Sequence, residues 1–149
     1  MGNLRAAVVG ETIFCVSNNA SPEAASWDQY MVLLGEHMAQ RSGKPGSLVV
    51  FAGGGTPDAS MRLKLRQTVN ERPLITSVVT DSVMVRGIIG VFSLFVGGTK
   101  PFAGREWKAS LEYAGFPVSK LSEALPVLRQ LDADVGGCSA LGVLLKEGK

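Results

Sequence analysis

Hydrophobic positions along the chain predict short strands that alternate with helices. The β-prone apolar runs lie at residues 6–10, 12–16, 48–52, 74–80 and 101–102. The first two runs meet at Gly10-Glu11, a glycine-containing break that is typical of a β-hairpin. The runs at 48–52 and 74–80 are continuously apolar, which is typical of strands covered on both faces.

Apolar residues spaced three or four positions apart predict helices in the intervening segments. The expected helices lie at residues 21–42, 58–72, 83–96, 104–114 and 122–135, and an apolar tail follows at 140–145. Ser21-Pro22 indicates the start of the first helix, because serine caps and proline suits the first helical position. Asp58 and the pair Asp81-Ser82 are the expected caps of two later helices.

This order of elements, ββαβαβαβα, predicts an α/β (α+β-like) fold with a mixed, mostly parallel sheet under helical cover. A chain of 149 residues has the size of one domain, and no internal repeat or linker interrupts it. We therefore expect a single domain over residues 1–149, in which residues 117–149 form a C-terminal helical extension.

Composition and charge narrow the function classes. Hydrophobic residues make up 46% of the chain and charged residues 19%, which is typical of a folded protein and excludes a disordered polyelectrolyte. The 15 basic and 13 acidic residues give a net charge of +2, so no nucleic-acid partner is expected. The uncharged stretch 87–99 is shorter than the roughly 20 residues of a membrane-spanning helix, so no transmembrane segment is expected.

The two cysteines, Cys15 and Cys138, have neither metal-ligand spacing nor the density of a disulfide framework. Reduced thiols and a cytoplasmic location are therefore expected. The N-terminal residues lack the apolar core of a signal peptide, in agreement with that location. Neither a metal nor a cofactor is expected.

The sequence offers little catalytic machinery. His37 is the sole histidine, and its place beside the apolar stripe of the first helix favours a surface position. Ser60, Ser82 and Cys15 are nucleophile candidates, but no recognisable motif places a histidine to activate them. We therefore expect no enzyme activity.

The glycine-rich turn at residues 53–55 lies between a strand and a helix, where phosphate-binding loops occur. It lacks the lysine of a P-loop, and Asp58 at the helix start would repel a pyrophosphate. The turn is interpreted as a tight connection onto a capped helix. On that helix, Arg62, Lys64 and Arg66 are expected to face water.

The helix at residues 83–96 is apolar nearly all round, which is typical of a helix buried on more than one side. Three interpretations stay open: contact with another subunit or partner, a ligand pocket, or ordinary core packing. If the helix binds a partner, the candidate contact residues are Met84, Ile88, Val91, Leu94 and Phe95.

The order of elements, together with three segments, resembles the STAS superfamily, and more closely its bacterial SpoIIAA-like proteins. The segments are Gly54-Gly55-Thr56-Pro57 through Arg62, residues 78–89 with the motif Thr80-Asp81-Ser82-x-x-Val85-Arg86-Gly87, and Lys100-Pro101-Phe102-Ala103 followed by Trp107 and Ala109. The resemblance covers residues 5–116. It implies a sheet of four or five strands with helices packed mainly on one face, no enzyme activity, and a role in docking onto or regulating other proteins. Some SpoIIAA-like relatives are thought to bind apolar ligands.

The resemblance also implies a phosphorylation switch. STAS regulators of the anti-sigma-antagonist type carry the sequence D-S-S-G at the helix start after the third strand, and its second serine is phosphorylated. Asp58-Ala59-Ser60-Met61 occupies that place. Asp58 and Ser60 match the motif, whereas its first serine and its glycine are replaced. Ser60 is therefore the candidate phosphorylation site.

These observations give two functional hypotheses. The first is a non-catalytic STAS-like regulatory module that forms a dimer or docks onto a protein through the helix 83–96. The alternative is a protein that binds a small apolar ligand or lipid in a pocket beside that helix, for which Trp27, Arg86 and Trp107 are the candidate residues.

Overall fold

The computed structural model describes residues 2–41, 43–92 and 98–148, with the side chains of 88–92 left out of the description. This part of the chain contains a five-stranded sheet whose strands lie in chain order. The strands are β1 (Leu4–Val9), β2 (Thr12–Ser17), β3 (Gly46–Ala52), β4 (Leu74–Val79) and β5 (Thr99–Phe102). β1 and β2 pair antiparallel, and the other neighbours pair parallel. The prediction of an α/β fold with a mixed, mostly parallel sheet is confirmed.

Six α-helices surround the sheet in the described residues. They are α1 (Ala24–Gln40), α2 (Ala59–Val69), α3 (Val83–Phe92), α4 (Trp107–Ala114), α5 (Leu121–Asp134) and α6 (Gly142–Glu147). Short 3-10 turns at Gly104–Glu106, Val118–Lys120 and Ser139–Leu141 lead into the last three helices. The apolar tail at 140–145 is thus helical, and the predicted helix at 104–114 begins with a 3-10 turn.

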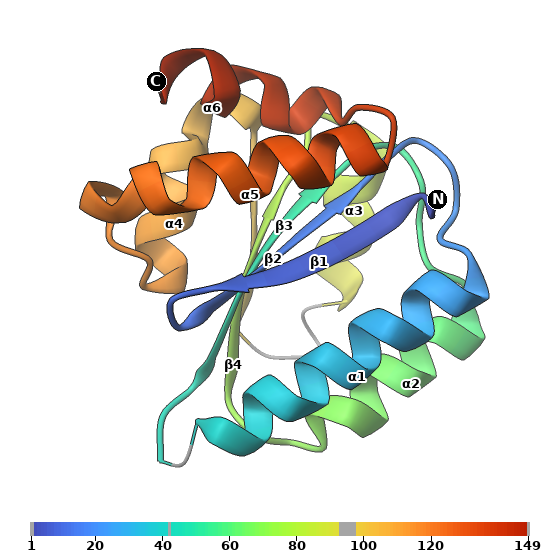
Figure 1. Ribbon diagram of the computed structural model, residues 1–149. Helices are drawn as coiled ribbons and strands as arrows, with labels where there is room; N and C mark the ends of the chain where they lie inside the picture. Colours follow the sequence, from blue (N-terminus) through green and yellow to red (C-terminus); the bar gives the residue numbers. More distant parts are fainter. Residues whose placement is uncertain (1, 42, 93–97, 149) are drawn as a thin grey trace.

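Helices cover both faces of the sheet, so the expectation that they pack mainly on one face is wrong (Figure 1). Ile13 and Cys15 of β2 pack toward α1 and α2, whereas Phe14 and Val16 pack toward α4, α5 and α6. The crossovers α1, α2 and α3 connect successive parallel strands, and right-handed crossovers between strands in chain order lie on one face. The opposite face is also apolar, and the chain after β5 folds back to bury it.

The C-terminal helices form a large share of that second core. Leu121, Leu128, Leu141 and Leu144 are buried against Phe14 and its sheet neighbours. Serine hydroxyls connect the sheet to α4: Ser47 Oγ donates to the carbonyl oxygen of Ala114 at 2.6 Å. The buried leucines make residues 117–148 part of the cover of the sheet.

The start of α1 differs from the prediction. The helix begins at Ala24, with Glu23 as its N-cap residue, and Ser21 does not cap it. The side chain of Asn3 decides this, because its Nδ2 donates to the carbonyl oxygen of Ser21 and its Oδ1 accepts the N–H of Glu23 at 2.9 Å. Asn3, which lies directly before β1, therefore fixes how the chain enters the helix.

The other two predicted caps are present. Asp58 Oδ1 accepts the N–H of Met61 at 2.8 Å at the start of α2, and Ser82 Oγ accepts the N–H of Val85 at 3.2 Å at the start of α3. Asp81 has a different role: its carboxylate accepts the N–H of Gly104 at 2.9 Å and connects the end of β4 to the turn before α4.

His37 is buried, so its expected surface position is wrong. Only 6% of the residue is exposed, and its Nε2 accepts the main-chain N–H of Ser47 at 3.1 Å. The histidine therefore joins α1 to the start of β3. Burial is the main reason that the pKa of His37 lies below its ordinary value of 6.5.

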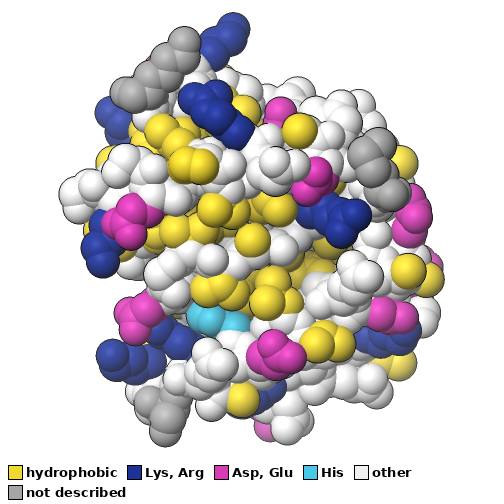
Figure 2. All heavy atoms as spheres, viewed as in Figure 1, with side chains coloured by type: hydrophobic (Ala, Val, Ile, Leu, Met, Phe, Trp, Pro, Cys, Tyr) yellow, Lys and Arg dark blue, Asp and Glu magenta, His cyan; other side chains and the backbone are white. Residues whose placement is uncertain are grey.

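The surface beside β1 carries exposed apolar side chains. Figure 2 shows hydrophobic side chains along a band between α5 and α1, where β1 forms one edge of the sheet. Val8 on β1 is 45% exposed and Val32 on α1 is 62% exposed.

None of the helices in the described ranges combines the length and the apolar character needed to cross a membrane.

Candidate functional site

A cavity of about 130 Å³ lies on the face of the sheet that carries α1, α2 and α3. α1 and α2 pack against each other, and α3 packs separately through Val85 on Ala52 and Val78. The cavity is the space between these two groups of helices. Its floor is made by alternate residues of three parallel strands, namely Cys15, Ser17, Leu48, Val50, Ala52, Leu74, Thr76 and Val78.

The strand period explains why this floor is so apolar. Successive side chains of a strand point to opposite faces, so every second residue of the buried strands faces the cavity. Trp27 and Tyr30 of α1, Leu65 of α2 and Val85 of α3 add apolar walls. The lining is almost wholly apolar, and an apolar cavity of about this size in another protein admits benzene.

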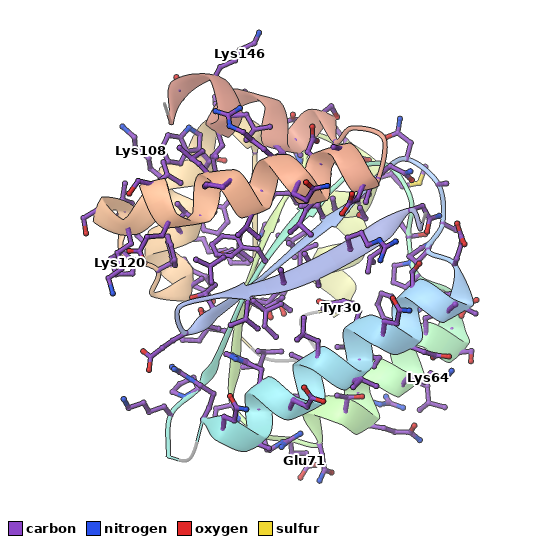
Figure 3. All side chains as sticks on the ribbon, in the orientation of Figure 1. Tyr30, Lys64, Glu71, Lys108, Lys120 and Lys146 are labelled. Carbon is purple, nitrogen blue, oxygen red and sulfur yellow. The ribbon has the colours of Figure 1, made fainter. Side chains whose placement is uncertain are left out.

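Trp27 forms a fixed wall of the cavity. Its indole Nε1 donates to the carbonyl oxygen of Met61 at 3.0 Å, and its ring packs edge to face on Tyr30 with centroids 5.4 Å apart. Tyr30 lies on the side of α1 that faces the sheet, whereas Lys64 and Glu71 point outward (Figure 3). The wall is therefore held in place before any ligand arrives.

Cys15 and Tyr30 keep the inner part of the cavity uncharged. Burial raises the pKa of the Cys15 thiol far above its usual range, and a hydrogen bond with Tyr30 opposes this shift only partly. Burial likewise raises the pKa of the Tyr30 hydroxyl. Both groups stay protonated at neutral pH, and the thiol is a poor nucleophile because the thiolate is the reactive form.

The expectation that Arg62 faces water is only partly right. The residue is half-buried and lines the cavity together with Gly55, Thr56 and Pro57, which are also partly exposed. Its Nη1 donates to the carbonyl oxygen of Pro57 at 2.8 Å. Arg62 is the only charged residue among the described residues of the lining.

The three predicted pocket residues do not come together. Trp27 lines the cavity, but Trp107 lies on the opposite face of the sheet, where it packs in the second core and donates from Nε1 to Glu147 at 2.8 Å. Arg86 on α3 is half-exposed and is not among the described lining residues. The sheet itself separates the two tryptophans.

The predicted partner-binding residues are only partly described. Met84 is 72% exposed, and its neighbour Val83 is 77% exposed. The side chains of Ile88 and Val91 are not described, although their backbone is helical. Leu94 and Phe95 lie outside the described residues. Met84 and Val83 therefore provide the exposed apolar surface that can be placed on α3.

The two residues of the predicted phosphorylation switch lie at the start of α2. Asp58 is its N-cap residue and Ser60 is exposed in its first turn. The glycines before them have a steric role: a Cβ at Gly55 would lie 1.9 Å from the carbonyl oxygen of Ala20, and one at Gly53 would lie 2.5 Å from the carbonyl carbon of Asn18. These glycines allow two loops to pass in contact. Modification of Ser60 stays a prediction.

No family model matches the chain, and neither a curated protein nor a solved structure matches it significantly. The resemblance to the STAS superfamily therefore stays a prediction, which depends on the order of elements and on the sequence motifs. Within the described residues, no group of three or more potential metal ligands is found. The apolar cavity and the exposed start of α3 are the features on which a function can be argued.

Proposed function

We propose that this protein binds a small apolar molecule in the cavity between α1, α2 and α3. The observation that carries the proposal is an apolar space of about 130 Å³ with a fixed aromatic wall. Small-molecule sites are concave and mostly apolar, with a few polar groups that orient the ligand. This cavity has that character, because its walls are apolar and Arg62 lies among its lining residues.

The physical chemistry of binding supports the proposal. An apolar molecule in the cavity gains dispersion contacts with its apolar walls and leaves water. A ligand that binds only the folded state also stabilises that state.

The proposal is for binding without catalysis. The Cys15 thiol is held protonated by burial, and the Nε2 of His37 already accepts the N–H of Ser47. Both groups thus have structural roles in the fold. We also propose a reducing, cytoplasmic location, which is supported by the free, buried state of Cys15 and Cys138.

Calorimetric titration with hexan-1-ol tests the proposal. Ala52 is 7% exposed and lines the cavity, so Ala52→Leu places three further carbon atoms in it. We expect the wild-type protein to bind hexan-1-ol and the variant to bind at least tenfold more weakly. Ala109→Leu is the matched control, because Ala109 is exposed on α4 across the sheet. Absence of binding to the wild type, or equal binding by Ala52→Leu, would contradict the proposal.

Native mass spectrometry of freshly purified protein gives a second, independent measurement. We expect an adduct whose mass corresponds to a small molecule, and we expect it to be lost in Ala52→Leu. A free ligand concentration one hundred times Kd would raise the free energy of unfolding by about 2.7 kcal/mol. The ligand should therefore also raise Tm.

A second candidate function is protein interaction through α3, as the STAS resemblance implies. Val83 and Met84 are more than 70% exposed at its start, an unusual position for large apolar side chains. Light scattering should then detect a dimer or larger assembly, and Met84→Lys should dissociate it without lowering Tm. Leu63→Lys on α2, where Leu63 is 45% exposed, is the control. A monomer at all concentrations that also captures no protein partner would contradict this candidate.

A further inference from the structure

We propose that the ligand carries a single carboxylate, which Arg62 binds at the entrance of the cavity while the apolar body occupies its interior. This inference depends on the proposed function, because it names the chemical class of the molecule that the cavity takes. It rests on the combination of one charged side chain with an otherwise apolar lining.

The guanidinium of Arg62 has more N–H donors than the described residues accept from. A guanidinium has five N–H donors, and the described residues engage one nitrogen, Nη1, with the carbonyl oxygen of Pro57. This contact holds the side chain along the loop that follows β3. The remaining donors form a planar fork that matches the two oxygens of a carboxylate.

The nearest acidic side chain on the same helix has another partner. Asp58 lies one turn before Arg62, and its Oδ1 accepts the N–H of Met61 at 2.8 Å. Neither ion pair found among the described residues, Arg41 with Glu11 or Lys64 with Asp28, includes Arg62. The charge of Arg62 is therefore uncompensated by a carboxylate of the described chain.

The apolar surroundings strengthen this preference for an anion. Charge interactions are weaker in water than beside a low-dielectric surface, and Arg62 is half-buried against the cavity lining. A carboxylate brings one negative charge to this one cation, whereas a phosphate monoester would bring nearly two. The charge balance thus favours a monocarboxylic acid.

The cavity volume sets the size of the apolar body. An engineered cavity of about 150 Å³ in another protein accepts benzene, so a space of about 130 Å³ suits a ring or chain of about six carbons. Hexanoate has this composition, with a carboxylate at one end. Hexan-1-ol and hexanamide have the same chain length and carry no charge.

The test compares these three molecules by calorimetric titration of the full chain. We expect wild-type protein to bind hexanoate at least tenfold more tightly than hexan-1-ol or hexanamide. In Arg62→Gln this preference should disappear, while the affinity for hexan-1-ol stays within twofold of wild type. Lys64→Gln removes the same charge from the outer side of α2 and should keep the preference.

The outcomes separate this inference from the proposed function. Equal affinity of the wild type for all three molecules would overturn the inference and leave the proposed function in place. Binding of none of them would overturn both. A hexanoate preference that survives in Arg62→Gln would overturn the role of Arg62. The comparison of ligands on the wild type needs no variant, so it decides the carboxylate preference even if Arg62→Gln is unstable.

Discussion

The indole Nε1 of Trp27 donates a hydrogen bond to the carbonyl oxygen of Met61, 3.0 Å away. This bond joins α1 to the first turn of α2, next to the position of Arg62. The hydrogen bond therefore connects the aromatic wall of the cavity directly to the backbone of the residue before Arg62. The affinity for a ligand that contacts the indole should therefore also depend on how α2, which carries Arg62, is placed.

The two tryptophans should respond differently to a ligand, because the sheet lies between them. In Trp107→Phe, saturation with hexan-1-ol should change the fluorescence of the remaining Trp27 in intensity or wavelength. In Trp27→Phe, the fluorescence of Trp107 should not change. A response confined to Trp107 would show that the molecule binds on the other face of the sheet.

Substitution of Gly55 by alanine should destabilise the protein. The new Cβ would lie 1.9 Å from the carbonyl oxygen of Ala20, so the backbone must move, at a cost of about 1–3 kcal/mol. Gly54→Ala is the matched control, since its Cβ would meet no atom closer than 3.8 Å. Urea denaturation should give a lower midpoint for Gly55→Ala alone, and equal midpoints would contradict the close approach of the two loops.

Stability should depend on pH through His37. Its folded-state pKa is below 6.5, so the unfolded state binds more protons and stability falls as pH drops below about 6.5. Above that pH the contribution is constant. His37→Gln, whose amide oxygen can still accept the N–H of Ser47, should remove the fall in stability that begins below about pH 6.5. Because this is the only histidine, an unchanged slope in the variant would refute the assignment.

Removal of the Asp58 cap should cost about 1 kcal/mol, since the N–H of Met61 loses its acceptor. Asp58→Ala can be compared with Asp28→Ala, which removes a surface ion pair to Lys64 worth about 0–1 kcal/mol. Chemical denaturation should rank Asp58→Ala as the less stable variant. The reverse order would mean that the ion pair contributes more than the cap.

Local signals in the sequence were enough to predict the sheet and two of the helix caps. The runs at 48–52 and 74–80 correspond to buried parallel strands. Asp58 and Ser82 cap the starts of α2 and α3, as their positions in the sequence predict. The start of α1 could not be predicted from the same signals. Asn3 fixes it from another part of the chain, and helix-start rules consider neighbouring residues only.

The candidate site was predicted only in part, because helical periodicity does not say which face of a sheet a helix covers. Trp27 and Trp107 both lie on apolar helix stripes, yet they belong to opposite cores. Arg62 has the spacing of a solvent-facing residue, and its contact with the cavity arises from how α2 and the loop after β3 meet. Such tertiary relationships leave no local pattern in the sequence.

The order of elements also determines which apolar surface is uncovered while the chain is being synthesised. β1 to β5 and the three crossover helices are synthesised first, and α4, α5 and α6 follow. Until those last helices appear, the sheet face that holds Phe14, Val49 and Phe51 has no cover. A nascent chain that pauses after β5 therefore exposes this apolar face to other molecules, and the face is buried only after α4, α5 and α6 have been synthesised.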